Sequence, residues 1–293
     1  MFKSDIRDSV KPMAHLQTAR SFLFAPGSDA RKLGRALECG ADAVIADLED
    51  AVVPAEKETA RALALGALVE AETTAVRLVR VNGVGTTWHE ADVEAVSGAG
   101  VDALVLPKAT AAAVASVAAA VDLPLVAIVE TAAGLREAFS IASHERVHVL
   151  LLGAVDLGLA LGLEQRVDGQ ELLFARSSLV VDCAAAGIRA PVDRVWIEVR
   201  DHDGLARDCA VARSLGYRGK ALIHPDQVAV AHEAFAASAS ELVRAREVVA
   251  AFDRAAAEGR GVLALDGEMI DLPVVERARQ LLSDEKRSVL HAE

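Results

Sequence analysis

Short apolar runs, each bounded by glycine, proline or a charged residue, alternate along the chain with Ala-rich amphipathic stretches. An apolar run of four to eight residues is typical of a buried strand, whereas the longer amphipathic stretches are typical of helices. The runs predict eight strands, of which the seventh is the weakest: 21–26, 43–49, 75–82, 103–108, 125–130, 147–153, 194–198 and 221–224.

The amphipathic stretches between these runs predict helices at 29–39, 56–70, 110–121, 134–143, 170–186 and 203–215. Eight strands alternating with helices indicate parallel β/α units, and closure of those units into a (β/α)8 barrel (a TIM barrel) is the simplest solution. A doubly wound open sheet is the main alternative fold.

The remainder of the chain, after Pro225, has helical periodicity only, interrupted at 258–261 and 265–273. We therefore expect a barrel over residues 1–235 and a C-terminal helical extension over residues 236–293. This extension could pack on its own barrel or contribute to the site of a neighbouring subunit. No internal repeat or low-complexity linker marks it as a separate module.

The composition fits this architecture and excludes some partners. A length of 293 residues is within the range of a single barrel domain, and 53% hydrophobic residues supply a large core. The formal net charge of −12 argues against nucleic acid or an anionic membrane as a partner, because phosphates would be repelled. An anionic small molecule is still possible where a cleft carries local positive charge or a metal.

The cysteines and the N-terminal sequence indicate the cellular compartment of the protein. Cys39, Cys183 and Cys209 are far apart and form no CxxC pair, as expected for free thiols in a reducing compartment. The N-terminus has no signal-peptide apolar core, and the apolar run at 147–153 is too short to span a bilayer. We expect a cytoplasmic protein.

Charged residues follow the predicted strands at their carboxyl ends, where barrel enzymes place their working side chains. Glu130 and Asp156 come just after two consecutive apolar runs, so the two carboxylates should converge at the mouth of the barrel. They would repel each other unless a cation or a proton lay between them. Hard oxygen ligands in low number suit Mg2+ better than zinc, although either acid could also be an ordinary solvated residue.

Arg80 lies in the third predicted strand, on the face that it shares with Leu78 and Asn82. A guanidinium on the inward face needs a carboxylate partner, and Asp47 or Glu49 from the neighbouring strand could provide it. Arg80 could equally bind a substrate carboxylate in bidentate geometry. The two interpretations are compatible, because the acids could orient the guanidinium.

A third candidate lies around the first strand. Arg20 precedes it, and the turn that begins with Pro26 and Gly27 leads into a helix with Lys32 in its first turn. A Gly/Ser turn at a helix N-terminus can hold a phosphate. The alternative is that the polar residues after Gly27 only cap the helix.

Eight ordered motifs between about residues 20 and 282 then identify a family. They are Leu23-Phe24-Ala25-Pro26-Gly27, Asp47-Leu48-Glu49-Asp50-Ala51-Val52, Val79-Arg80-Val81-Asn82, Leu106-Pro107-Lys108, Glu130-Thr131-Ala132, Gly153-Ala154-Val155-Asp156, Gly219-Lys220-Ala221-Leu222-Ile223-His224-Pro225 and Asp266-Gly267-Glu268-Met269-Ile270-Asp271. Together they resemble the citrate lyase β-subunit-like (CitE-like) branch of the HpcH/HpaI aldolase family, which also contains malyl-CoA and citramalyl-CoA lyases. The chain departs from the pattern of many relatives at Val155 and at Leu157-Gly158-Leu159, which leaves the acyl specificity open.

The resemblance implies a barrel that assembles as a trimer or hexamer. It also implies roles for the candidate residues: Mg2+ held by Glu130 and Asp156, a keto-acid carboxylate on Arg80, support from Asp47 and Glu49, CoA phosphates facing Arg20 and Lys32, and Asp271 as an acid/base delivered from a neighbouring subunit.

The function that the resemblance implies is a Mg2+-dependent carbon–carbon lyase. It would cleave a 3-hydroxy-carboxyacyl thioester, such as malyl-CoA or citramalyl-CoA, to acetyl-CoA and a 2-keto acid, or form the thioester from these two compounds. One alternative is a citrate lyase β subunit acting on citryl held by an acyl-carrier protein. Another is an aldolase acting on a free hydroxy-keto acid, and a third is a catalytically silent barrel that serves as a binding or scaffold protein. The sequence does not assign a role to His224, which is as compatible with a structural histidine as with a substrate contact.

Overall fold

The computed structural model describes residues 14–164, 166 and 168–290. The first 13 residues of the predicted barrel domain and the last three of the predicted C-terminal extension lie outside the described residues. The chain divides into two compact units, Met1–Phe235 and Ala236–Glu293. No helix of the described chain combines the length and the apolar character that a membrane span requires.

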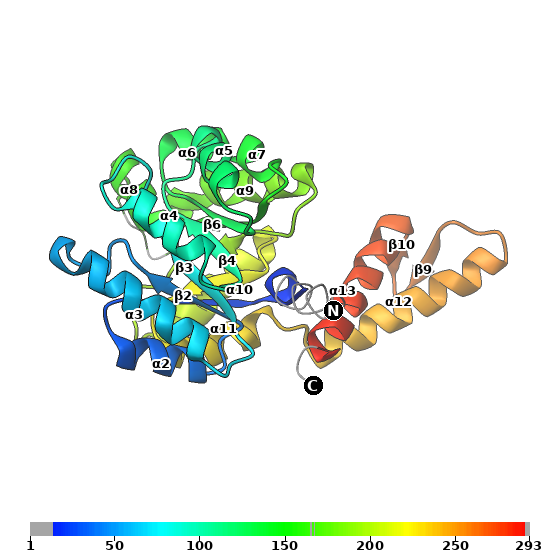
Figure 1. The fold of residues 1–293 in the computed structure, drawn as a ribbon. Coiled ribbons are helices and arrows are strands. Elements are labelled where there is room, and N and C mark those ends of the chain that lie inside the picture. Colours follow the sequence, from blue (N-terminus) through cyan, green and yellow to red (C-terminus); the bar gives the residue numbers. More distant parts are fainter. Residues whose placement is uncertain (1–13, 165, 167, 291–293) are drawn as a thin grey trace, which may run out of the picture. The chain divides into compact units, whose positions relative to one another are not determined.

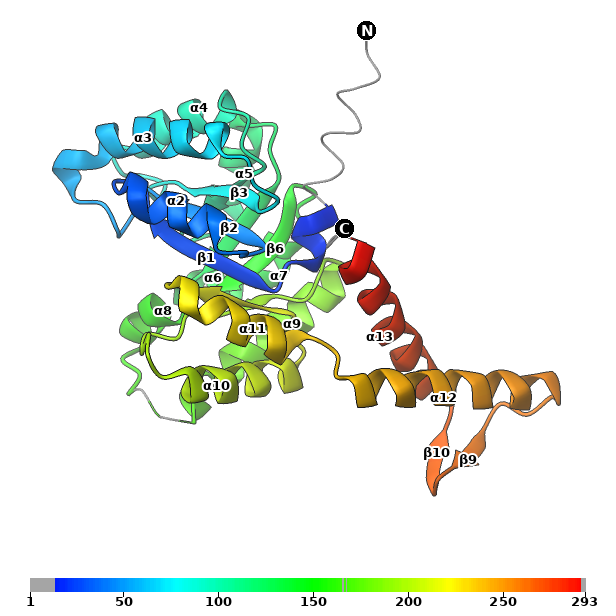
Figure 2. The same ribbon diagram turned by 90° about the horizontal axis from the view of Figure 1, so that it is seen from below.

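The first unit is a closed barrel of eight parallel strands in chain order, as the alternating pattern predicts. Helices surround these strands in both views (Figures 1 and 2). The strands are β1 (Ser21–Pro26), β2 (Ala43–Asp47), β3 (Val76–Arg80), β4 (Ala103–Leu106), β5 (Leu125–Val129), β6 (Val147–Leu152), β7 (Val192–Asp193) and β8 (Gly219–Leu222). Closure removes every free strand edge, since β1 pairs with both β2 and β8.

Helices and short 3-10 turns connect the strands. They are α2 (Ala30–Glu38), η1 (Pro54–Glu56), α3 (Lys57–Glu70), α4 (His89–Ser97), α5 (Ala111–Ala120), α6 (Ala132–Arg136), α7 (Ala138–Ala142), α8 (Ala154–Leu161), η2 (Gln170–Leu172), α9 (Leu173–Ala186), α10 (His202–Leu215), η3 (Pro225–Gln227) and α11 (Val228–Phe235). The predicted helix 134–143 is thus two short helices, and α4 and α8 were not predicted.

Alternate residues of each strand divide into an inner and an outer core. The inner cluster fills the barrel with side chains such as Phe22, Ile45, Leu78 and Ile128. The residues between them pack outward against the helices in a larger cluster. Successive side chains of a strand point to opposite faces, so this division fixes which strand-end residues face the barrel mouth.

The prediction of the seventh strand at 194–198 is wrong, because β7 is only Val192–Asp193. The sequence signal was weak because Asp193 lies on the outer face and pairs with charged partners. It accepts hydrogen bonds from Arg176 and Lys220, and all three side chains are buried. An ion-paired strand has no apolar run to detect. The eighth strand is likewise displaced, to Gly219–Leu222 from the predicted 221–224.

The second unit contains α12 (Ala239–Ala257), a hairpin of β9 (Leu263–Leu265) and β10 (Glu268–Ile270), and α13 (Leu272–Leu290). The expectation of helices alone after Pro225 is therefore wrong. Asp266 and Gly267 both have positive φ, which suits the two-residue turn of a tight hairpin. The unit has its own apolar core, in which Phe252, Ile270 and Val275 are buried.

Candidate active site

The carboxyl ends of β2 and β3 join an arginine to an aspartate. Asp47 and Arg80 are register partners in the parallel ladder, and both side chains are buried. Arg80 donates from Nε and Nη2 to the two Asp47 oxygens, each at 2.7 Å. Burial by itself would lower the pKa of Arg80, but the Asp47 carboxylate more than offsets it, and the pKa is raised. This edge of the guanidinium is therefore fixed by the protein itself.

The remaining nitrogen of Arg80 points to two further acids. Nη1 lies 3.0 Å from Glu49 Oε2 and 3.2 Å from Asp50 Oδ2. Asp50 is mostly exposed, whereas Glu49 is buried and its Oε2 has no hydrogen-bond partner. Burial raises the pKa of Glu49 despite the nearby cations. An anion could displace Asp50 and reach Nη1 without breaking the Asp47 pair.

Lys108 connects this cluster to Glu130. Its Nζ donates to Glu49 Oε1 at 2.6 Å, and its backbone N–H donates to Glu130 Oε1 at 2.7 Å. The φ of Lys108 is +49°, in the left-handed region that few residues other than glycine adopt. The sequence places Lys108 at a strand end but gives no signal of this backbone conformation.

Glu130 is the most perturbed acid at this rim. Burial raises its pKa to about 8, the charges of Glu49 and Asp156 add to the effect, and the Lys108 N–H and Arg80 oppose it. The second oxygen, Oε2, packs against Gly153, where an added Cβ would come within 2.5 Å of it. Gly153 thus leaves the space that this carboxylate occupies.

Asp156 lies in the first turn of α8, half-buried, and is close enough for its charge to raise the pKa of Glu130. A divalent cation beside Glu130 would favour its charged form and relieve the repulsion between the two acids. The donors fit a hard cation that takes oxygen ligands. No three His, Cys, Asp or Glu side chains are grouped to hold a metal within the described residues, so water or substrate would complete the coordination.

A buried lysine, Lys57, holds the backbone that follows β2 in place, and the sequence analysis did not identify it. Lys57 donates to the carbonyls of Leu48 and Glu49 and to Asn82 Oδ1, all within 2.7 Å. Burial lowers the pKa of Lys57, with the surrounding acids opposing the shift. Asp92 Oδ2 accepts hydrogen bonds from the backbone N–H and the side-chain amide of Asn82. Lys57 begins α3 and Asp92 lies in α4, and the sequence alone does not show that either side chain is buried.

The turn after β1 lies at the same rim. Gly27 donates its N–H to the Asp47 carbonyl, and an added Cβ would lie 2.8 Å from that oxygen. Pro26 pairs with Asp47 in the sheet register. Asp29 caps α2 by accepting from the Lys32 N–H, and the exposed Lys32 ammonium lies 3.5 Å from Asp29. Asp29 therefore caps the helix, and the exposed Lys32 ammonium forms an ion pair with this cap.

Arg20 is not brought to this rim. It precedes β1, at the amino-terminal end of the barrel, where its N–H donates to Asp42 and its guanidinium contacts the His232 carbonyl. Ser21, His232 and Asp42 meet here as well, but they do not form a nucleophilic triad. Ser21 Oγ (2.8 Å) and Asp42 Oδ2 (3.2 Å) share one ring nitrogen, Nε2, and the Ser21 side chain is buried.

Two other candidates act as helix caps. Asp271, in the second unit, accepts from the Val274 N–H at 3.3 Å at the start of α13, and it is half-buried. His224 accepts from the Asp226 N–H and begins η3. A capping role for Asp271 does not exclude chemistry, because its other carboxylate oxygen makes no hydrogen bond among the described residues.

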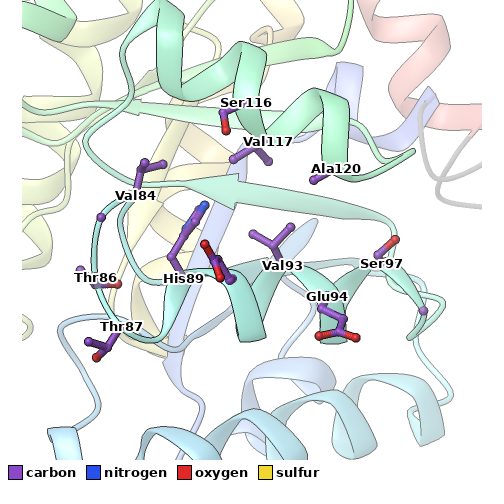
Figure 3. A pocket seen from close by; sticks show the side chains of 13 residues that line it. Val84, Thr86, Thr87, His89, Val93, Glu94, Ser97, Ser116, Val117 and Ala120 are labelled. Carbon is purple, nitrogen blue, oxygen red and sulfur yellow. The ribbon is translucent and has the colours of Figure 1, made fainter.

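A separate groove of about 1020 Å3 lies between α4 and α5 and shares no residue with this cluster. Figure 3 shows His89, Val93 and Glu94 along one wall and Ser116, Val117 and Ala120 along the other. His89 is engaged by the Asn82 carbonyl at 2.7 Å. Its described lining residues include no Lys or Arg to pair with Glu90 and Glu94, in contrast to the mixed charges at the strand ends.

A closed parallel barrel with acids and an arginine gathered at the carboxyl ends of its strands has the architecture of the barrel enzymes. Residues 20–225 match the model of the HpcH/HpaI aldolase/citrate lyase family, and the chain belongs to this family.

The comparisons with individual proteins cover nearly the whole chain. A (3S)-malyl-CoA thioesterase of Cereibacter sphaeroides is 40% identical over 275 residues, which cover 92% of this chain and 96% of the relative. The citrate lyase subunit beta of Escherichia coli K12 is 36% identical, with 94% and 96% covered. CitE of Mycobacterium tuberculosis, solved with magnesium, acetoacetate and coenzyme A, is 32% identical with a TM-score of 0.80, and 92% and 98% are covered.

Proposed function

We propose that this protein is a Mg2+-dependent carbon–carbon lyase. Its substrate would be a 3-hydroxy-carboxyacyl thioester such as malyl-CoA or citramalyl-CoA, and its products acetyl-CoA and a 2-keto acid. The observation that carries the proposal is the buried Glu130 carboxylate, with a pKa raised to about 8, beside an arginine locked in place by Asp47. The Mycobacterium tuberculosis CitE complex with magnesium, a keto acid and coenzyme A supports it.

Each residue of the cluster has a distinct role in this proposal. Glu130 and Asp156 would hold the cation, which would supply Lewis acidity at the hydroxyl or keto oxygen of the substrate. Asp47 orients Arg80, so that Nη1 receives the substrate carboxylate in place of Asp50. Lys108 fixes Glu130 through its N–H and neutralises Glu49.

Asp271 is the proposed acid/base. Cleavage removes the hydroxyl proton and breaks the C–C bond, and the electron pair passes to the thioester enolate carbon. Solvent accepts the hydroxyl proton, a protonated Asp271 donates its proton to the enolate carbon, and solvent then reprotonates Asp271, so the protons balance between substrate and products. We propose that a neighbouring subunit of a trimer or hexamer delivers Asp271. The exposed apolar side chains beside it, Met269 (69%) and Leu272 (54%), are suited to burial against another subunit.

For the CoA phosphates we propose Lys32, with the turn at Pro26 and Gly27 beside it. Lys32 is exposed and lies at the N-terminal turn of α2, where positive charge and free N–H groups favour anions. Arg20 has other partners at the opposite end of β1, away from Lys32, and has no role in this phosphate site.

The test is a panel of hydroxyacyl-CoA thioesters incubated with the protein and Mg2+. The lyase predicts a 2-keto acid, detected as its phenylhydrazone, in equal amount to acetyl-CoA. EDTA should stop the reaction and added Mg2+ should restore it. Full activity in EDTA, or cleavage without keto acid, contradicts the proposal.

Hydrolysis of the thioester is a second candidate, favoured by the malyl-CoA thioesterase relatives. It would release free CoA thiol and malate rather than a keto acid, so a thiol reagent and the phenylhydrazone assay separate the two reactions. Because Ser21, His232 and Asp42 do not form a triad, hydrolysis would use a water molecule activated at the strand ends.

The citrate lyase β-subunit relatives favour a third substrate, a citryl group on an acyl-carrier protein. Cleavage of a free CoA thioester without any partner protein would exclude a requirement for that carrier. A silent scaffold would bind neither Mg2+ nor a keto acid, and calorimetric titration of both tests this.

A further inference from the structure

Lys57, the first residue of α3, is a buried lysine whose hydrogen bonds go to neutral oxygens. Its Nζ donates to the carbonyls of Leu48 and Glu49 at 2.7 and 2.6 Å, and to Asn82 Oδ1 at 2.7 Å. The indole ring of Trp88 lies 5.3 Å away. An ammonium has three N–H donors, so all three are used and none is directed at a carboxylate. Because a buried charge is costly without an opposite charge, we expect this lysine to balance acids that it does not touch.

The charges at the carboxyl ends of β2 and β3 balance only when Lys57 is included. Three acids and two cations form ion pairs there: Asp47, Glu49, Asp50, Arg80 and Lys108. Three negative charges thus face two positive ones. Lys57 supplies the third positive charge, since the charges of all three acids act on it and oppose the fall in its pKa that burial causes. A fourth acid that acts on Lys57, Asp92, has its own cation in Arg61 at 2.7 Å.

This balance affects how strongly Arg80 can bind an anion. Asp50 is the exposed acid of the set, with a side chain that is 59% accessible, and it lies 3.2 Å from Arg80 Nη1. A ligand carboxylate that takes the place of Asp50 leaves the net charge around Arg80 unchanged. Without Lys57, the same carboxylate would enter a mostly buried site that already has an excess of negative charge, and its binding would be weaker.

We propose that Lys57 is a positioning residue for the substrate carboxylate. It holds the backbone at Glu49, and its positive charge allows a carboxylate to replace Asp50 on Arg80. The ammonium acts through Glu49 and Arg80 and does not itself touch the substrate. The inference rests on the proposed function for the choice of a 2-keto acid as the ligand.

The experiment is calorimetric titration of the full-length protein with pyruvate at saturating Mg2+, and with Mg2+ alone. Lys57→Gln removes the charge but keeps a donor, and it should weaken pyruvate binding by about tenfold. The Mg2+ affinity should stay within about twofold of the wild type, because loss of a positive charge does not weaken the binding of a cation. A merely structural role would weaken both. Lys57→Met should behave like Lys57→Gln, and Lys286→Gln, at an exposed site, is the matched control.

A compensating substitution provides a second readout. Asp50→Asn removes one negative charge at an exposed position and keeps every contact of Lys57, so by itself it should tighten pyruvate binding. This variant remains informative if the Lys57 variants do not fold. In the double variant Lys57→Gln/Asp50→Asn the charges balance again, and the pyruvate affinity should return to within about threefold of the wild type. A lysine that only stabilised the fold would not be rescued in this way.

Unchanged pyruvate affinity in both Lys57 variants, an equal loss of pyruvate and Mg2+ binding, or an Asp50→Asn protein that does not bind pyruvate more tightly overturns the inference. If pyruvate binding depends on Lys57 but no thioester is cleaved to a keto acid, the inference stands and the proposed function fails. If thioesters are cleaved and the Lys57 variants bind pyruvate as the wild type does, the proposed function stands and the inference fails. A wild-type protein that binds no 2-keto acid at millimolar concentration overturns both.

Discussion

Lys108 donates its backbone N–H to Glu130 from a left-handed conformation, with φ at +49° and an N···O distance of 2.7 Å. The same residue directs its ammonium to Glu49. One residue just after β4 thus orients the buried acid that follows β5 and neutralises the acid that follows β2. The backbone strain is the cost of making both contacts from a single position.

Substitutions at Lys108 should reveal this strain. Both Lys108→Gly and Lys108→Ala lose the contact with Glu49, but only glycine adopts positive φ without penalty. Lys108→Gly should therefore be more stable than Lys108→Ala by about 1 kcal/mol in urea unfolding. Equal stability, or the opposite order, would show that the left-handed conformation is not retained.

The two proposed metal ligands should be required for metal binding and turnover alike. Glu130→Gln and Asp156→Asn keep the size of the side chain but remove the charge that a divalent cation needs. Each should lower kcat/KM by at least about 100-fold and weaken Mg2+ binding measured by calorimetry. Glu145→Gln is the exposed control. A variant with intact Mg2+ affinity would remove that residue from the metal site.

The raised pKa of Glu130 predicts how the stability of the metal-free protein depends on pH. Its pKa rises from an ordinary value of 4.5 to about 8, so between these values the folded state binds a proton that the unfolded chain releases. Stability from this group is present at low pH and is lost as the pH rises through about 8. In EDTA, the melting temperature of the wild type should therefore fall relative to Glu130→Gln between pH 5 and 9. Saturating Mg2+ should reverse that difference, and parallel curves for the two proteins would contradict the assignment.

Arg80 balances the buried acids of β2. Arg80→Met would leave Asp47 and Glu49 buried without their cation, which should cost about 3–5 kcal/mol in unfolding free energy. Arg80→Lys keeps the charge but cannot make the two parallel bonds to Asp47, so we expect an intermediate loss. Arg31→Met, on the exposed face of α2, should change stability by less than about 0.5 kcal/mol.

Substitution of Asp271 should impair turnover without impairing ligand binding. Asn caps a helix as well as Asp does, so Asp271→Asn should keep the cap of α13 and the stability of the protein. Turnover should fall by about 100-fold or more, because the amide cannot transfer the proton, while Mg2+ and keto-acid binding stay nearly intact. Equal loss of binding in calorimetry would make Asp271 a structural residue.

The sequence predicted the barrel because most of its strands are apolar runs with a turn signal after them. Residues such as Ile45 and Ile128 point into the barrel at every second position of their strands, and this period of two can be recognised in the sequence. Asp193 and Lys220 break the pattern, since they are buried by pairing with each other and with Arg176. The hairpin at Asp266 and Gly267 was missed because its strands are only three residues long.

By itself, the sequence determined the order of the strands and the charged residues at their ends, since parallel strands bring all their carboxyl ends to one rim. Only the tertiary structure decided which of those charges meet. It pairs Arg80 with Asp47, directs the backbone N–H of Lys108 to Glu130 and places Arg20 at the opposite end of the barrel. It also reveals Lys57, because burial and hydrogen-bond geometry depend on contacts between segments far apart in the chain.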